Sequence, residues 1–129
     1  MAKTHKLADL QLAIMQVLWD QGKATVAEVR QALMPDRELA HTTVGTMLSK
    51  MEEKGFVTHS NDGRANIYEA KLQQHRVNRS MVDDLANRLF GGDLPAMVCH
   101  LLEGRDVSAD ELDKMKKLIS EKEKELRNE

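Results

Sequence analysis

Short hydroxylated side chains and one lysine recur along one face of a helix predicted between residues 41 and 56. Thr43, Thr46 and Lys50 follow one another at spacings of three and four residues, which places them on the same face of a helix. Hydroxyl and ammonium groups donate hydrogen bonds to phosphate oxygens and base edges, and a threonine methyl can contact the methyl of thymine. This face therefore has the chemistry of a helix that lies in the major groove of DNA.

Three neighbouring residues extend this candidate surface. Thr42 and Ser49 lie at its margins, and Gly45 lacks the Cβ that would limit a close approach. Threonine, serine and glycine each disfavour a helix by roughly 0.5 to 1 kcal/mol relative to alanine, so helix stability does not account for them. The same residue types also fit the capped and solvent-exposed positions of any helix. Spacing alone leaves both interpretations open.

Apolar residues indicate how this helix and two earlier ones pack. The opposite face of the 41–56 helix is apolar, and the helix ends at Lys54–Gly55, a basic last turn followed by a glycine cap. A first helix is predicted to end at Gly22, and a second to begin at the capping box Thr25-Val-Ala-Glu28 and end at Pro35. The apolar positions of the three helices are Leu10, Ile14, Val17, Leu18, Val26, Val29, Leu33, Val44, Met47, Leu48 and Met51.

A β-hairpin is predicted to follow the third helix. Residues 56–59 and 66–69 are rich in β-formers, and residues 60–64 between them are rich in turn formers. Three helices and a hairpin within about 70 residues are the order of a winged helix-turn-helix. Three helices with a decorative hairpin would contain the same local pieces.

The tip of this hairpin offers a second candidate contact with the DNA backbone. Asn61, Gly63 and Arg64 combine hydrogen-bond donors with a basic side chain. An ordinary exposed turn is the alternative interpretation. Basic residues within 3–6 form either a flexible arm near phosphate or a disordered start.

Residues 73–129 are predicted to form a helical dimerisation domain behind a winged-helix domain of residues 1–72. A first helix stops at Gly91–Gly92, an apolar segment follows, and the capping box Ser108-Ala-Asp-Glu111 opens a last helix. These 57 residues are too few to enclose a core alone, so a second copy is expected to cover their apolar side. The predicted dimerisation residues are Val77, Met81, Leu85, Leu89, Met97, Val98, Leu101, Leu102, Leu112, Met115 and Ile119.

Bulk charge argues mildly against a nucleic-acid partner, so the case for DNA binding has to come from geometry. The chain has 129 residues and a formal net charge of −2, and its first 72 residues carry nine Lys/Arg against nine Asp/Glu. A basic surface is the usual signature of DNA binding, so this balance keeps open a winged helix used for protein contact.

Other function classes find little support in the sequence. No apolar run approaches the roughly 20 residues of a membrane span, which predicts a cytoplasmic protein. Cys99 is the single cysteine, and His41, His59, His75 and His100 are scattered, so a metal-responsive regulator is a weaker alternative. No phosphate loop, His-Glu-x-x-His motif or activated nucleophile is present, so we expect neither a cofactor nor an enzyme.

Longer stretches of the sequence resemble one family of repressors. LADLQLAIMQVLW at residues 7–19, TVAEV at 25–29 and TTVGTMLSKMEEKGFV at 42–57 are similar to the BlaI/MecI penicillinase-repressor family, which also includes copper-responsive repressors. The likeness runs from about residue 7 to residue 118. It implies a dimeric winged-helix repressor that binds a palindromic operator, with its third helix in the major groove and its C-terminal helices forming the dimer.

The resemblance also assigns residues by position. It places Thr43, Thr46 and Lys50 on the family's reading helix and Arg64 on its wing. Gly45 departs from the family, since many members carry a larger and often basic side chain there, which puts the operator sequence in doubt. Ala40 departs as well, because it stands where a serine cap is frequent, and the start of the helix can shift by a residue or two without that cap.

Two modes of induction are known in the family. Copper-responsive members use a C-terminal cysteine cluster, which Cys99 alone cannot form. Penicillinase repressors are inactivated by a cut at an Asn-Phe bond, and His100–Leu101 stands at the matching position here. Because the bond type is not kept, release by a membrane-bound sensor protease is a hypothesis.

Overall fold

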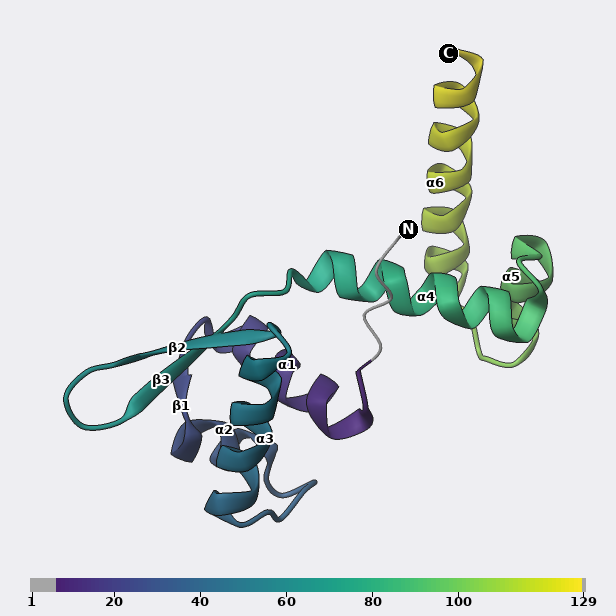
Figure 1. The fold of residues 1–129 in the computed structure, drawn as a ribbon. Helices are drawn as coiled ribbons and strands as arrows, with labels where there is room; N and C mark the ends of the chain where they lie inside the picture. The colour runs from purple at the N-terminus through teal and green to yellow at the C-terminus, as the bar shows by residue number, and fades with distance from the viewer. Residues whose placement is uncertain (1–6, 129) are drawn as a thin grey trace. The chain divides into compact units, whose positions relative to one another are not determined.

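Six helices and three short strands are present in residues 7–128, the part of the chain that this computed structural model describes (Figure 1). Apart from β1, the first elements follow the order of the predicted winged helix-turn-helix, three helices and then a hairpin, and three further helices come after them. Their bounds are α1 Asp9–Gln21, β1 Ala24–Thr25, α2 Val26–Leu33, α3 His41–Glu53, β2 Val57–Asn61, β3 Asn66–Ala70, α4 Gln74–Phe90, α5 Leu94–Glu103 and α6 Ala109–Arg127.

The strands form one antiparallel sheet in the order β1-β3-β2. The predicted hairpin is confirmed, and its strands reach Asn61 and Asn66, which face each other at the tip. The third strand, β1, was not predicted. It is only two residues long, too short for a hydrophobic period, and it exists because Ala24 lies opposite Tyr68 in the middle of β3. Figure 1 shows the β2–β3 hairpin extending away from helices α1, α2 and α3.

Local capping signals start and end the helices where the sequence predicts. The Thr25 hydroxyl accepts a hydrogen bond from the Glu28 amide at 3.2 Å, and the Glu28 carboxylate accepts one from the Thr25 amide at 2.9 Å. Gly55, at φ +83°, makes the tight left-handed link between α3 and β2 that a side chain would strain. The Ser108–Glu111 capping box at the start of α6 is confirmed as well.

The core gathers apolar side chains from α1, α2, α3 and the sheet. The inner face of α3 is fully buried, since Val44, Leu48 and Met51 are 0% exposed. This helix packs against α2 and β2. The buried residues of the core are Leu7, Ile14, Met15, Leu18, Ala24, Val29, Leu33, Val44, Leu48, Met51, Val57, Tyr68 and Val77.

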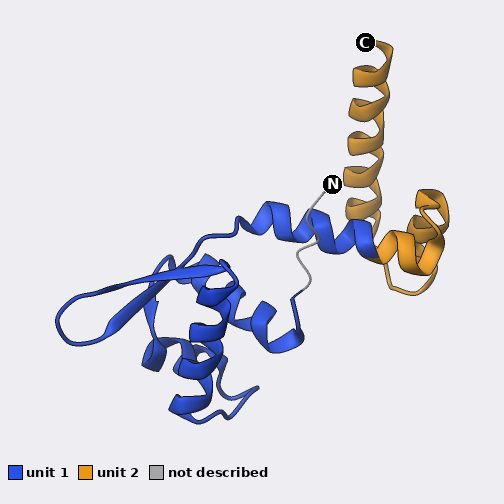
Figure 2. Ribbon diagram, viewed as in Figure 1, with its two compact units in different colours: residues 1–84 blue, residues 85–129 orange. Residues whose placement is uncertain are grey.

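The chain divides into two compact units at a point inside α4 (Figure 2). Unit 1 comprises residues 1–84 and unit 2 residues 85–129. The beginning of α4 belongs to unit 1 because Val77 is 0% exposed in its core and Met81 packs partly against that core. Val77, which the sequence analysis assigned to dimerisation, is therefore a core residue of unit 1 in this structure.

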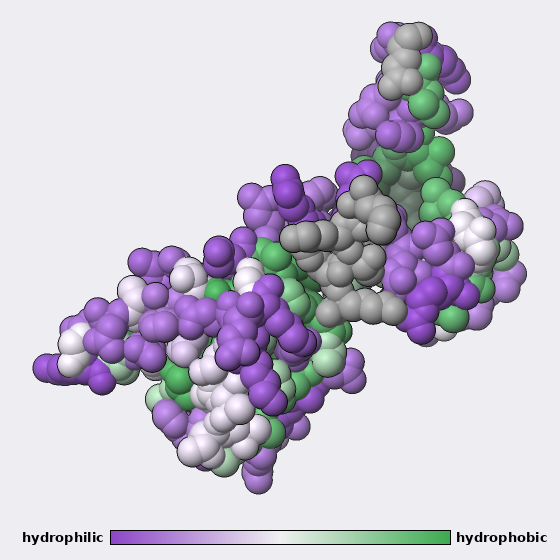
Figure 3. Space-filling model, in the orientation of Figure 1, coloured by the Kyte–Doolittle hydropathy of each residue, from purple (hydrophilic) through white to green (hydrophobic). Residues whose placement is uncertain are grey.

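Unit 2 contains no buried side chain among its described residues, 85–128. Its helices instead expose large apolar side chains, and hydrophobic surface is visible over α5 and α6 (Figure 3). The strongly exposed members are Leu85, Leu89, Leu94, Val98, Leu101, Leu102, Leu112, Leu118, Ile119 and Leu126. None of the helices in residues 7–128 is both long enough and apolar enough to cross a membrane.

Two valines of α4 test the extent of the winged-helix core. In a fragment of residues 1–84, Val77→Ala is expected to lower the free energy of unfolding by about 2 kcal/mol, because it opens a cavity. Val82→Ala removes the same atoms from a side chain that is 52% exposed, and its effect is expected to stay within about 0.5 kcal/mol. Urea unfolding followed by Trp19 fluorescence measures both. Equal effects of the two substitutions would show that α4 is not part of this core.

Candidate nucleic-acid interface

The outer face of α3 presents the polar residues that the sequence analysis singled out. Thr43, Thr46 and Lys50 are all exposed, as are Thr42 and Ser49 at the margins. They face outward because Val44, Leu48 and Met51 of the same helix are fully buried on the other side. The structure thus brings all five side chains to one accessible helical surface.

The first turn of α3 is left without a side-chain cap. The helix begins at His41, and Ala40 at its N-cap position provides no hydrogen-bond acceptor from its side chain. The backbone amides of a first helical turn have no partner within the helix, and together with the helix dipole they attract anions such as phosphate. The start of α3 therefore adds backbone donors to the hydroxylated face.

Gly45 is not required by packing inside the protein. It is half-buried, and a Cβ built on it would lie 3.9 Å from Cγ1 of Val26, which is an ordinary van der Waals contact. Its backbone conformation is helical and needs no glycine. The core therefore does not explain the absence of a side chain at this position.

Arg30 holds the connection that leads into α3. Its Nε donates a 2.7 Å hydrogen bond to the carbonyl oxygen of Leu39, the residue before the N-cap. This bond joins α2 to the start of α3 across a connection of seven residues. The sequence analysis missed Arg30 because no local spacing indicates which distant carbonyl a side chain will meet.

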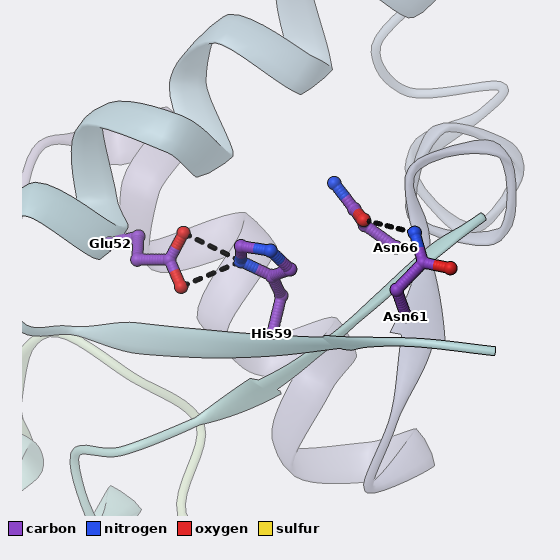
Figure 4. Close-up of polar contacts among 4 residues, drawn as sticks. All are labelled: Glu52, His59, Asn61 and Asn66. Atoms are coloured by element: carbon purple, nitrogen blue, oxygen red, sulfur yellow. Dashed lines mark hydrogen bonds and ion pairs between the residues drawn. The ribbon is translucent and has the colours of Figure 1, made fainter. Parts of the chain in front are cut away.

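The wing, defined as the β2–β3 hairpin of residues 57–70, ends in a turn ordered by its own side chains. The Asn61 amide group donates to Oδ1 of Asn66 at 2.9 Å (Figure 4), and its oxygen accepts from the Gly63 amide at 2.7 Å. Oδ1 of Asp62 accepts from the amides of Arg64 and Ala65 at 2.9 and 3.0 Å. The exposed Arg64 side chain therefore projects from a defined turn.

Asp62 is a second residue that the sequence analysis left out of the site. The hydrogen bonds from the backbone amides of Ala65 and Arg64 stabilise its carboxylate and lower its pKa below the ordinary 3.8. It is therefore ionised at neutral pH and offsets the charge of Arg64 at the wing tip. The Asp-Gly turn signal is visible in the sequence, whereas the two amides that stabilise the carboxylate are apparent only in the folded turn.

The other sequence candidates do not assemble into a site in this structure. Among residues 7–128, no three His, Cys, Asp or Glu side chains gather in a way that could hold a metal ion. Cys99 is exposed and donates to Oε1 of Glu103 at 3.3 Å, and this carboxylate raises the pKa of the thiol. Lys3, His5 and Lys6, the candidate arm, lie outside the described residues.

Helices α1 to α3, the three-stranded sheet and its projecting hairpin define a winged helix-turn-helix protein, with an exposed polar face on the third helix. Comparison with known proteins identifies the particular group. Residues 7–121 match the family described as penicillinase repressor, and the chain belongs to this family.

Relatives match along nearly the whole chain. The transcriptional regulator BlaI of Mycobacterium tuberculosis is 37% identical over 123 residues, which cover 94% of this chain and 88% of that protein. The penicillinase repressor of Bacillus licheniformis is 26% identical over 121 residues, 94% of each chain. The resemblance to this family, drawn from residues 7–19, 25–29 and 42–57, is thereby confirmed.

A solved structure of a relative is similar to part of the chain. The solution structure of monomeric BlaI from Bacillus licheniformis in complex with the blaP half-operator superposes with a TM-score of 0.50 at 26% identity. It covers 59% of this chain and 93% of that one.

Acid titration tests the turn at the wing tip. Because the pKa of Asp62 is lowered by folding, its contribution to the ordered turn is expected to be complete above pH 3.8 and to disappear as the pH falls through the lower folded value. The amide proton shifts of Arg64 and Ala65, followed by NMR, should titrate with that low midpoint. In Asp62→Asn, the oxygen still accepts both bonds but the titration should vanish. A midpoint at or above 3.8 would show that the two amides do not stabilise the carboxylate.

Proposed function

We propose that this chain is a sequence-specific DNA-binding transcriptional repressor that acts as a homodimer on a palindromic operator. The observation that carries the proposal is the exposed hydroxylated face of α3 beside an ordered wing, in a member of the penicillinase repressor family. The solved complex of a relative with a half-operator supports assigning one half-site to each winged helix.

In this proposal, α3 reads the bases and the wing holds the backbone. Thr43, Thr46 and Lys50 enter the major groove, with Thr42 and Ser49 near its edges and Gly45 permitting the close approach. Asn61, Gly63 and Arg64 contact the phosphate backbone beside the groove, which fixes the register without reading sequence. Few charges take part, so affinity depends on the fit of small side chains more than on a basic surface.

The exposed apolar side chains of unit 2 are proposed as the dimer interface. A chain with no buried side chain in residues 85–128 cannot hold this region in a stable packed form alone. Residues of α5 and α6 also line an open apolar hollow of about 630 Å³, among them Leu94, Val98, Leu102 and Ile119. The interface keeps the predicted residues Met81, Leu85, Leu89, Met97, Val98, Leu101, Leu102, Leu112, Met115 and Ile119, without Val77.

Dimerisation is proposed as the regulated quantity. Two weak half-site contacts joined in one dimer act at a high effective concentration, so separating them costs a factor of roughly 10² to 10⁴ in operator affinity. Any event that disrupts the helices of unit 2 would then release the DNA.

A membrane-bound sensor protease is one proposed source of such an event. His100 and Leu101 are both exposed, but they lie inside α5, so this turn must unwind before a protease can bind it in extended form. Incubation of the dimer with the cognate protease tests this part of the proposal. If the chain stays intact, the inducing step is of another kind.

A winged helix used for protein contact is the rival favoured by the balanced charge of the first 72 residues. Footprinting on the region upstream of the gene for this chain separates the two functions. A protected dyad at near-physiological salt supports the repressor, and its absence supports the rival.

Gly45→Ala is expected to change stability and DNA affinity in opposite directions. The alanine should raise the free energy of unfolding by about 0.5 to 1 kcal/mol, because helix propensity improves and the Val26 contact is unstrained. It should also weaken operator binding by roughly tenfold, because the new methyl group limits the approach of α3. Urea unfolding and a DNA titration on the same sample measure both. Unchanged affinity would remove Gly45 from the interface.

Thr46→Asp is expected to abolish specific DNA binding while the dimer stays intact, because it places a negative charge opposite phosphates. Asn78→Asp makes the same change of charge at an exposed position of α4 and is the matched control. Fluorescence anisotropy with an operator duplex measures affinity, and light scattering measures the mass. Wild-type affinity in Thr46→Asp would mean that another face of α3 meets the DNA.

Ile119→Asp is expected to give a monomer, because it places a charge among the apolar residues that the partner chain covers. Ser120→Asp introduces the same residue one position along α6 and should leave the dimer unchanged. Analytical ultracentrifugation measures the mass, and titration of a half-site duplex should show unchanged affinity in both variants. A dimeric Ile119→Asp would place the interface elsewhere.

A further inference from the structure

A hydrogen-bonded pair of side chains ties the end of α3 to the wing (Figure 4). Glu52 lies in the last turn of α3, and His59 is the third residue of β2. The imidazole Nδ1 lies 2.7 Å from both carboxylate oxygens of Glu52, so an Nδ1–H proton donates to this carboxylate. The His59 side chain is 36% exposed and the Glu52 side chain is 32% exposed.

The His59 ring is held from a second direction by the other strand of the wing. His59 lies directly opposite Tyr68 in the β2–β3 register, and the two ring centroids are 5.3 Å apart at an interplanar angle of 42°. Tyr68 is only 4% exposed and also pairs with Ala24 of β1. The imidazole therefore bridges a carboxylate on α3 and an aromatic ring anchored in the core.

The Glu52–His59 bridge lies between the buried base of the wing and its exposed tip. Val57, two residues before His59, is buried in the core and fixes the base of the hairpin. From Ser60 to Ala65, the hairpin is exposed up to and around its tip, where Arg64 lies. The bridge thus stands near the base of the exposed part of the hairpin, one register pair before Ser60 and Ile67, where Ile67 also pairs with Thr25 of β1. Together with this pairing, it sets the angle at which the tip leaves the body.

We propose that Glu52 and His59 are positioning residues for DNA binding, which hold the wing at the angle to α3 at which Arg64 and Lys50 contact the same duplex. The inference rests on the proposed function. Neither side chain touches DNA in this account. They act through the orientation of the wing.

Electrostatics supports this assignment over a stabilising one. A carboxylate at the end of a DNA-reading helix repels phosphate, so its presence at position 52 works against binding unless another group satisfies it. Hydrogen-bonded pairs that are about a third exposed contribute little to folding stability, because water screens them. A positioning role accounts for a carboxylate in this place, whereas a gain in stability does not.

The test measures how much Arg64 contributes to DNA binding when the bridge is present and when it is absent. His59→Phe keeps a ring against Tyr68 but removes the donor, whereas His59→Asn keeps a donor close to the position of Nδ1. Arg64→Ala is made in the wild-type chain and in each of these backgrounds. Affinities are measured with a duplex carrying the dyad protected upstream of the gene and with a scrambled duplex of equal length.

If the bridge positions the wing, Arg64→Ala weakens operator binding by roughly tenfold in the wild-type chain and by no more than about threefold in the His59→Phe background. The full loss returns in the His59→Asn background. The urea midpoint of unfolding stays unchanged in His59→Phe, which a merely structural role would not allow. Glu125→Ala removes an exposed carboxylate paired with Lys122 on α6 and serves as a control without effect on affinity.

Two outcomes overturn the inference, and they are distinguishable. If the wild-type chain binds the dyad and Arg64→Ala has the same effect in all backgrounds, the wing is not positioned by this bridge, although the proposed function stands. If the wild-type chain binds the dyad duplex no more tightly than the scrambled duplex, the proposed function fails and this inference fails with it. Should His59→Phe fold poorly, Glu52→Ala provides the background without the bridge.

Discussion

The burial of one apolar stripe on α3 is the constraint on which the rest of the molecule depends. Val44, Leu48 and Met51 are fully buried against α2 and β2, and this fixes the rotation of the helix about its own axis. Once the rotation is fixed, the hydroxylated residues on the opposite face are exposed to solvent. The candidate DNA surface is therefore a consequence of core packing, and its residues contribute nothing to holding the helix in place.

The wing is ordered by polar and ring contacts more than by burial, since a hairpin that projects from the body has little core to hold it. Its tip is ordered by short-range hydrogen bonds from Asn61 and Asp62, and its root by the His59 ring between Glu52 and Tyr68. These contacts allow a single exposed arginine to be presented from a defined place. In the proposed function, a few donors held in defined positions take the place of the bulk positive charge that this chain lacks.

The two units differ in how far their apolar side chains are buried. Unit 1 contains every fully buried side chain among the described residues, so it has a core of its own. Unit 2 leaves its apolar side chains in water, where each costs free energy until something covers it. In the proposed function, regulation acts on the association of unit 2, because disrupting that association leaves the core of unit 1 intact.

The sequence by itself determined the elements whose signals act over three or four residues. The Thr25–Glu28 box, the glycine after α3 and the helical spacing of apolar residues reflect local energetic preferences. Signals of this kind predicted each helix and the hairpin. Only the tertiary structure decided which distant groups meet: β1 against Tyr68, Arg30 with the Leu39 carbonyl, Glu52 with His59, and Val77 in the core of unit 1. These contacts join residues on different elements, and their geometry depends on how several elements pack at once, which no single stretch of sequence encodes.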